Sequence, residues 1–186
     1  MIPFVPDNLP HVHRLGKYQD GLIDLCTWAK GRMGGSRAVE VGSYLGESAQ
    51  IISRYYATLW CVDLWGNHHL GTPAFDIFLK RFPDSDKPGG CTTEWGSQVF
   101  ALRMASPGAA DRFDGPLDFV YIDGNHGPAE CKADIQAWLP KVRHGIIAGH
   151  DYELVLQPGV VKAVDEMLGK PAKVFVDTSW AFVIDT

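Results

Sequence analysis

Aspartate and histidine side chains follow two apolar segments of the chain, at the point where each segment ends. Asp123 and His126 come after one apolar run, and His150 and Asp151 come after the next. Carboxylates and imidazoles together bind divalent cations, since hard Mg²⁺ prefers the oxygens and softer ions tolerate histidine. We therefore predict Asp123, His150 and Asp151 as metal ligands. The alternative is that each aspartate only caps the helix or turn that follows it.

A second candidate site combines a glycine turn with a carboxylate one strand later. Gly42 and Gly46 flank a turn after an apolar run, where glycine allows close approach of the backbone to a ligand. Asp63 ends the next apolar run, 21 residues after Gly42, and a carboxylate there can accept hydrogen bonds from ribose hydroxyls. The glycine spacing differs from the dinucleotide fingerprint G-x-G-x-x-G, and Glu40 would repel a pyrophosphate. The pattern favours an adenosyl group that carries a sulfonium.

The elements that must position these residues are short apolar strands that alternate with helical segments. This alternation predicts a parallel sheet covered on both faces, with ligands at the carboxyl ends of the strands. We expect a single doubly wound, Rossmann-like α/β domain over residues 20–186, with a C-terminal antiparallel strand, after a loose arm over residues 1–19. Strands are expected at 38–41, 59–62, 100–104, 117–122, 145–148, 172–176 and 180–184, and helices at 20–32, 47–56, 74–82, 94–100, 107–112, 128–138 and 159–168.

The composition excludes several classes of protein. Apolar residues make up 46% and charged residues 21% of the chain, with a net charge of −5 and no basic tract to bind nucleic acid. The four cysteines form no CxxC pair, which predicts reduced thiols and a reducing compartment. No apolar run approaches the roughly 20 residues of a membrane span, and the first residues do not read as a signal peptide. We expect a cytoplasmic protein without membrane or nucleic-acid partners.

Several blocks of this sequence resemble class I S-adenosylmethionine-dependent methyltransferases. The resemblance is strongest to the group that includes macrolide sugar O-methyltransferases and the protein called cephalosporin hydroxylase, and it covers about residues 20–185. The blocks are Glu40-Val41-Gly42-x-x-x-Gly46-x-Ser48, Val62-Asp63-Leu64-Trp65, Leu117-Asp118-Phe119-Val120-Tyr121-Ile122-Asp123-Gly124-Asn125-His126, the segment 133–152 and the segment 158–164.

The resemblance implies roles for individual residues. His126 matches a general base of the sugar methyltransferases, and Asp123 is expected to act with it in catalysis. Asp123 and the pair His150-Asp151 match the metal ligands of relatives that bind a divalent cation such as Mg²⁺, although such relatives often carry an acid where His150 stands. The residues expected to bind S-adenosylmethionine are Glu40, Gly42, Ser43, Tyr44, Gly46, Ser48, Asp63, Leu64, Trp65, Ser106 and Asp123.

The predicted function is O-methylation of a small hydroxylated molecule, because a metal ion and a general base can together remove the proton of an alcohol. We expect the acceptor to be recognised by the arm, the 64–74 loop and the 83–96 segment, and an exposed arm could also pack across a homodimer. Three alternatives stay open: a metal-independent methyltransferase that acts on another atom, a nucleoside-binding protein without catalysis, and a nicotinamide-linked oxidoreductase, which the glycine spacing disfavours.

Overall fold

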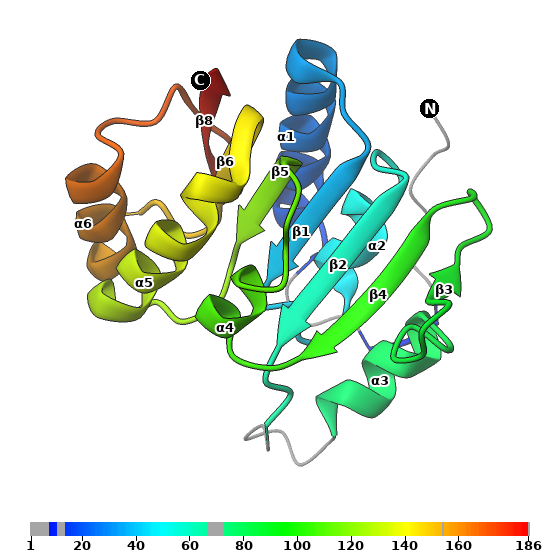
Figure 1. The fold of residues 1–186 in the computed structure, drawn as a ribbon. Coiled ribbons are helices and arrows are strands. Elements are labelled where there is room, and N and C mark those ends of the chain that lie inside the picture. The colour runs from blue at the N-terminus through cyan, green and yellow to red at the C-terminus, as the bar shows by residue number, and fades with distance from the viewer. Residues whose placement is uncertain (1–7, 11–13, 67–72, 154, 186) are drawn as a thin grey trace.

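The computed structural model describes residues 8–10, 14–66, 73–153 and 155–185 as a three-layer α/β structure (Figure 1). The helices are α1 (Lys17–Met33), α2 (Glu47–Ile52), α3 (Ala74–Arg81), α4 (Ser106–Ala110), α5 (Pro128–Trp138) and α6 (Pro158–Met167), with a 3-10 turn at Leu139–Lys141. The strands are β1 (Arg37–Val41), β2 (Thr58–Asp63), β3 (Cys91–Thr92), β4 (Gln98–Arg103), β5 (Leu117–Ile122), β6 (Val142–Gly149), β7 (Lys173–Val174) and β8 (Trp180–Asp185).

The strands form one sheet in the order β3-β4-β2-β1-β5-β6-β8-β7. The five central strands from β4 to β6 are parallel, whereas β3 and the C-terminal strands β8 and β7 pair antiparallel. The chain builds outward from β1 in one direction through β2 and β4, and then returns to β5 on the other side of β1. This reversal of strand order opens a crevice at the carboxyl ends of β1 and β5, which confirms the predicted doubly wound fold.

Alternating side chains along each strand divide the core between the two faces of the sheet. On β1, Val39 and Val41 pack with α4, α5 and α6, whereas Ala38 packs with α1, α2 and α3 on the opposite face. Successive strand residues point to opposite faces, so a strand that is apolar on both sides is buried between two helical layers. Figure 1 shows these helices on the two sides of the sheet.

Two predicted segments differ from the structure. The helix expected at 94–100 is absent: a hairpin joins β3 to β4 there, and Gly96 takes a left-handed conformation in its turn, with a φ of 86°. The arm expected at 1–19 is ordered by the fold near its end, since α1 already begins at Lys17 and Arg14 is only 3% exposed. The closing hairpin near the C-terminus forms as predicted.

Among the described helices, none combines the length and apolar character that crossing a bilayer requires. The four cysteines are buried and none of them forms a disulfide.

Candidate functional site

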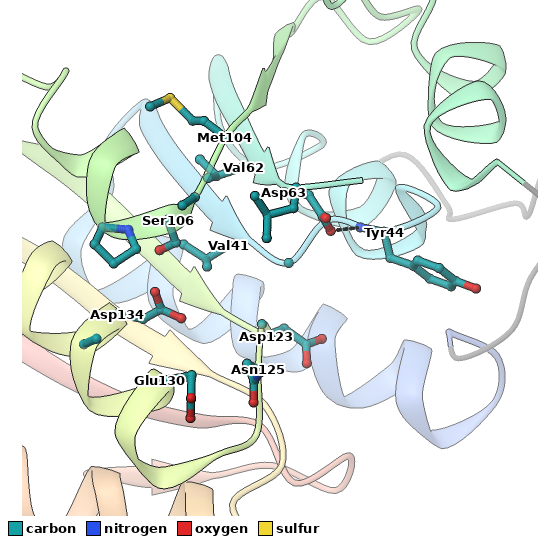
Figure 2. Close-up of a pocket in the computed structure, with 16 residues that line it drawn as sticks. Val41, Tyr44, Val62, Asp63, Met104, Ser106, Asp123, Asn125, Glu130 and Asp134 are labelled. Atoms are coloured by element: carbon teal, nitrogen blue, oxygen red, sulfur yellow. Dashed lines mark hydrogen bonds between the residues drawn. The ribbon is translucent and has the colours of Figure 1, made fainter. Parts of the chain in front are cut away.

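A cleft of about 450 Å³ lies where β1, β2, β4 and β5 end, at the topological switch point of the sheet (Figure 2). This volume falls in the range of small-molecule sites. Apolar side chains line one part of the cleft and carboxylates the other. The lining residues are Val41, Gly42, Tyr44, Val62, Asp63, Leu64, Met104, Ala105, Ser106, Pro107, Asp123, Gly124, Asn125, Glu130, Ala133 and Asp134.

The floor of the cleft depends on a glycine at the end of β1. Gly42 has a φ of 87°, and a β-carbon placed on it would lie 2.0 Å from the backbone oxygen of Asp123. A side chain at this position would therefore push the ends of β1 and β5 apart and also strain the backbone. The close approach brings the turn after β1 and the loop after β5 to the same edge of the cleft.

Asp63 ends β2 with its carboxylate held by two backbone amides. The N–H of Tyr44 donates to Asp63 Oδ2 at 2.9 Å (Figure 2), and the N–H of Trp65 donates to Asp63 Oδ1 at 2.7 Å. Each carboxylate oxygen can accept a second hydrogen bond. The two amides thus fix the orientation of an anionic acceptor at the rim of the cleft, and they link the loops after β1 and β2.

The structure brings together six of the predicted cofactor-binding residues as lining of the cleft, namely Gly42, Tyr44, Asp63, Leu64, Ser106 and Asp123. The other five do not line it. Trp65 packs its ring against Phe75 and Phe78 and donates from Nε1 to the backbone oxygen of Tyr44, so its side chain belongs to the core. The remaining four lie buried behind the cleft in β1 and α2 or in the turn between them; they are Glu40, Ser43, Gly46 and Ser48.

Glu40 is a carboxylic acid enclosed by the core. It is fully buried, and neither of its side-chain oxygens has a hydrogen-bond partner of normal geometry among the described residues. Burial raises the pKa of Glu40 to about 7, although the nearby hydroxyls of Ser43 and Ser48 oppose the shift. The carboxyl group of Glu40 therefore titrates near neutral pH. It lies on the opposite side of β1 from the apolar part of the cleft.

Three polar residues of the cleft, Asn125, Glu130 and Asp134, were not among the residues predicted to form the site. Asp134 lies on α5, and burial raises its pKa while the hydroxyl of Ser106 opposes the shift. Ser106 also accepts a hydrogen bond of 2.9 Å from Trp138 Nε1, which fixes the start of α4 against α5. Only the packing of α4 against α5 shows that this helix face borders a cavity.

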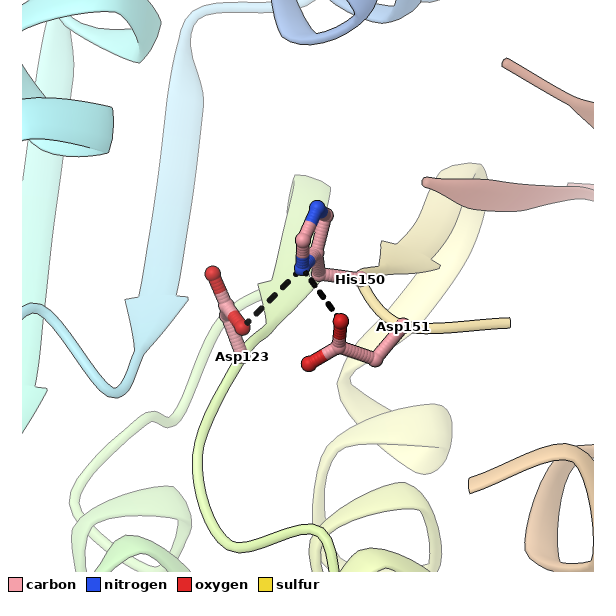
Figure 3. A group of neighbouring side chains, drawn as sticks. All are labelled: Asp123, His150 and Asp151. Atoms are coloured by element: carbon pink, nitrogen blue, oxygen red, sulfur yellow. Dashed lines mark ion pairs between the residues drawn. The ribbon is translucent and has the colours of Figure 1, made fainter. Parts of the chain in front are cut away.

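The three predicted metal ligands do meet at one end of the cleft (Figure 3). One ligand atom each from Asp123, His150 and Asp151 lies within 4.8 Å of the others. Nδ1 of His150 stands between the carboxylates, 3.1 Å from Asp151 Oδ1 and 3.7 Å from Asp123 Oδ1. Strands β5 and β6 are neighbours and parallel, so their carboxyl ends deliver these side chains to the same place.

His126, the predicted base, contacts Asp151 from the loop after β5. Its Nε2 lies 2.9 Å from Asp151 Oδ2, and this hydrogen bond raises the pKa of His126. Burial alone would raise the pKa of Asp151, but hydrogen bonds from His126 and His150 lower it well below its ordinary value. Asp151 is thus an anion that orients both imidazoles.

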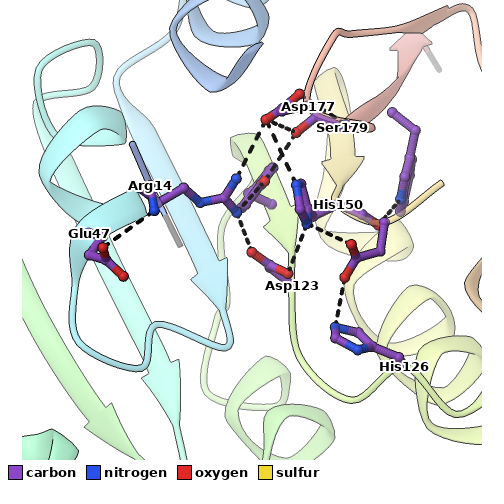
Figure 4. Close-up of polar contacts among 10 residues, drawn as sticks. Arg14, Glu47, Asp123, His126, His150, Asp177 and Ser179 are labelled. Carbon is purple, nitrogen blue, oxygen red and sulfur yellow. Dashed lines mark hydrogen bonds and ion pairs between the residues drawn. The ribbon is translucent and has the colours of Figure 1, made fainter. Parts of the chain in front are cut away.

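A further cation, which the sequence analysis missed, enters the same cluster from the N-terminal arm (Figure 4). The guanidinium of Arg14 forms an ion pair with Asp123 Oδ2, donates to the hydroxyl of Tyr121 at 2.9 Å and lies 3.5 Å from Asp177 Oδ2. Burial alone would lower the pKa of Arg14, but Tyr121, Asp123 and Asp177 raise it above its ordinary value. The guanidinium is therefore charged.

Strained backbone conformations occur in the loops that carry these side chains. Among the described residues, Tyr44, Trp65 and Asp151 have φ values of 42°, 43° and 62°, in the left-handed region that non-glycine residues rarely adopt. Such conformations persist where the surroundings impose them, and they concentrate at ligand-binding sites. All three residues follow the carboxyl end of a strand of the parallel sheet.

Comparison with known proteins gives a family and a fold. Residues 39–152, more than half of the chain, match the protein family described as "Methyltransferase domain". A search of curated protein sequences finds no significant match.

Several solved structures share the fold at low sequence identity. An O-methyltransferase from Bacillus cereus in complex with S-adenosylhomocysteine has a TM-score of 0.63 and 16% identity, over 95% of this chain and 84% of that one. A protein from Corynebacterium glutamicum has a TM-score of 0.62 and 15% identity, over 96% and 84%. Magnesium protoporphyrin IX methyltransferase from Synechocystis with bound S-adenosylmethionine has a TM-score of 0.57 and 12% identity, over 91% and 80%.

Proposed function

Because the chain belongs to the methyltransferase-domain family and is an S-adenosylmethionine-dependent methyltransferase, we propose that it methylates an oxygen of a small hydroxylated molecule. The observation that carries the proposal is the cleft at the switch point, where Gly42 allows the ends of β1 and β5 to approach each other and Asp63 presents an oriented carboxylate. The structural neighbour from Bacillus cereus, named as an O-methyltransferase, supports oxygen as the accepting atom.

The proposed placement of the cofactor follows the polarity of the cleft. Asp63 is proposed to accept hydrogen bonds from the ribose hydroxyls, since both of its oxygens keep a free lone pair beside their backbone donors. The adenine would lie toward Ser106, between the apolar side chains of Val62 and Met104. The methionine part would then lie along the turn at Gly42, which leaves the sulfonium near Asp123.

S-adenosylmethionine supplies an electrophilic methyl group, and the side chains around Asp123 must prepare the nucleophile. Because Nε2 of His126 faces Asp151 Oδ2, the neutral imidazole carries its proton on Nε2 and leaves Nδ1 as the basic nitrogen. We propose that Nδ1 takes the proton of the acceptor hydroxyl while the oxygen is held in line with the methyl group. Asp151 stabilises the imidazolium that results.

The three predicted metal ligands do not fit a divalent cation well in this arrangement. Asp123 already has a full cationic partner in Arg14, and His150 Nδ1 already pairs with Asp151. A divalent ion bound by this trio would lie next to a buried guanidinium. The proposed reaction therefore uses His126 as the base without a metal ion; it shares the absence of a metal with the open alternative of a metal-independent methyltransferase, but not that alternative's other acceptor atom.

Titration calorimetry with S-adenosylhomocysteine tests the proposed cofactor site. We expect wild-type protein to bind the ligand and Asp63→Ala to bind it at least about tenfold more weakly, the scale of one lost charge-assisted hydrogen bond. Asp86→Ala, which removes an exposed carboxylate that does not line the cleft, serves as the matched control. No binding by folded wild-type protein, or equal affinity of Asp63→Ala, would contradict the proposed site.

The remaining expectations stay proposals of the same kind. We propose that the protein is a cytoplasmic enzyme that acts on a small-molecule substrate and has no nucleic-acid partner. We propose that its methyltransferase domain spans residues 20–186. The homodimer would be tested by light scattering on the full chain. Parts of the arm and of the 64–74 loop, including His68 and His69, lie outside the described residues.

A further inference from the structure

The cation nearest to Asp123 is part of the protein itself. Arg14 reaches Asp123 Oδ2 with one guanidinium nitrogen and approaches Asp177 Oδ2 with the other, at 3.5 Å (Figure 4). Only 3% of Arg14 is exposed, and Asp177 is fully buried. Asp123 is 18% exposed at its side chain and also lines the cleft, so the guanidinium lies directly behind a residue of the proposed active site.

A chain of hydrogen bonds fixes the guanidinium in this position. Arg14 donates to the hydroxyl of Tyr121, which lies 3.2 Å from Ser179 Oγ, and Ser179 donates in turn to Asp177 at 2.8 Å. The backbone N–H of Arg14 also donates to Glu47 of α2, at 3.4 Å. Contacts on several sides hold a planar guanidinium in one orientation, which a flexible ammonium would not match.

In this position the guanidinium of Arg14 competes with a metal ion for the carboxylate of Asp123. A divalent cation coordinated by Asp123, His150 and Asp151 would share the carboxylate that now pairs with Arg14 and would need the nitrogen that now faces Asp151. It would also bring two positive charges next to a third one in a buried site, where charges are poorly screened. Asp123, His150 and Asp151 have the residue types and spacing of a metal site, but the guanidinium of Arg14 already supplies a cation at Asp123.

We propose that Arg14 takes the place of a divalent metal at Asp123, so that the enzyme works without one and the trio binds metal only when Arg14 is removed. The inference rests on the proposed function for its catalytic meaning, but its test needs no methyl acceptor. Arg14 is a positioning residue, because it acts through Asp123 and does not itself border the cleft.

The role in the reaction follows from the position of Asp123 between Arg14 and His150. With Oδ2 paired to Arg14 and Oδ1 3.7 Å from His150 Nδ1, the carboxylate is held at the edge of the cleft, beside the proposed place of the methyl donor. The hydroxyl proton passes to His126, the oxygen–carbon bond forms, and the carbon–sulfur bond breaks with its electron pair left on sulfur, which yields S-adenosylhomocysteine. Arg14 keeps Asp123 oriented throughout without exchanging a ligand.

The test is a titration of metal-free protein with Mn²⁺, in which electron paramagnetic resonance measures the free ion. We expect wild-type protein to leave Mn²⁺ free up to about 1 mM, and Arg14→Met to bind it at least about tenfold more tightly, since a three-ligand site with two carboxylates becomes available. Because that variant leaves Asp177 buried without its cation, the double variant Arg14→Met/Asp177→Asn is measured in parallel.

Three controls separate the outcomes. Arg32→Met removes an exposed guanidinium at the far end of α1 and should behave as wild type, whereas Arg14→Lys loses the geometry of the guanidinium but retains the charge and should still bind Mn²⁺ less tightly than Arg14→Met. Adding Asp123→Asn to the double variant should abolish the gained binding. Tight Mn²⁺ binding by wild-type protein, or no gain in either folded Arg14→Met variant, would overturn the inference. Titration of the same samples with S-adenosylhomocysteine shows separately whether the proposed cofactor site fails.

Discussion

The substitution Glu40→Gln tests whether burial in β1 disfavours the ionised form of the Glu40 carboxyl group. The amide has the shape of the protonated carboxyl group but cannot ionise. Glu40 is fully buried on β1, and burial raises its pKa from 4.5 to about 7. In the unfolded chain the same group titrates near its ordinary value, so the two states bind different numbers of protons between these limits.

The sign and size of the effect follow from this difference. Below about pH 4.5 Glu40 is protonated in both states and its ionisation does not affect stability. As the pH rises toward 7, the unfolded chain releases the proton while the folded protein keeps it, so the free energy of unfolding falls. Each pKa unit corresponds to about 1.4 kcal/mol, which gives a loss of about 3 kcal/mol that is complete above pH 7.

Urea unfolding of ligand-free protein between pH 5 and 8.5 measures this loss. We expect Glu40→Gln to remove most of the decline, so that the variant is more stable than wild type at pH 8 by up to about 3 kcal/mol and closer to it at pH 5. Glu94→Gln, at an exposed glutamate, should leave the decline in place. If Glu40→Gln showed the same slope as wild type, the carboxylate would have a partner that stabilises its charge, and the reasoning would be wrong.

Two further predictions concern the cleft and the base. Gly42→Ala should lower the free energy of unfolding in urea by more than about 2 kcal/mol, because its β-carbon would meet the backbone of Asp123. The variant should also lose S-adenosylhomocysteine binding. The control Gly31→Ala places its β-carbon in open space on α1 and should be neutral or stabilising. In an NMR titration, His126 should titrate above its ordinary pKa of about 6.5, and Asp151→Asn should lower that midpoint; an unchanged midpoint would show that Asp151 does not govern the base.

The strands of the parallel sheet could be predicted from sequence because burial on both faces makes them short apolar runs. Leu117–Ile122 is the clearest case, and its bounds agree with the structure. The segment 94–100 failed for a different reason: its turn is defined by tertiary contacts, among them the 2.9 Å hydrogen bond from Trp95 Nε1 to the backbone oxygen of Ser53. An amphipathic pattern over a few residues cannot distinguish such a hairpin from a helical turn.

The residues of the candidate site likewise include some that the sequence predicts and some that it does not. Asp63 and Asp123 could be predicted to border the same cleft, although β1 lies between their strands, because the carboxyl ends of parallel strands share an edge of the sheet. Arg14 could not, since a charged residue in an arm rich in proline has no local feature that indicates burial. Trp65 was assigned to the cofactor from its position after Asp63, but its large apolar ring is buried against α3. Local position predicts where the backbone of a loop lies and does not predict which way its side chains point.

The pairing of Arg14 with Asp177 joins residues that are 163 positions apart. Proteins are made from the N-terminus, so a growing chain exposes Arg14 long before its partner has been synthesised. The hydrogen bonds that link Asp63 to Tyr44 and Trp65 join residues of about the first third of the sequence, whereas the ion-pair cluster must wait for the hairpin of β7 and β8. A nascent or C-terminally truncated chain would therefore acquire the edge proposed to bind the cofactor before it acquires the ordered ion-pair cluster.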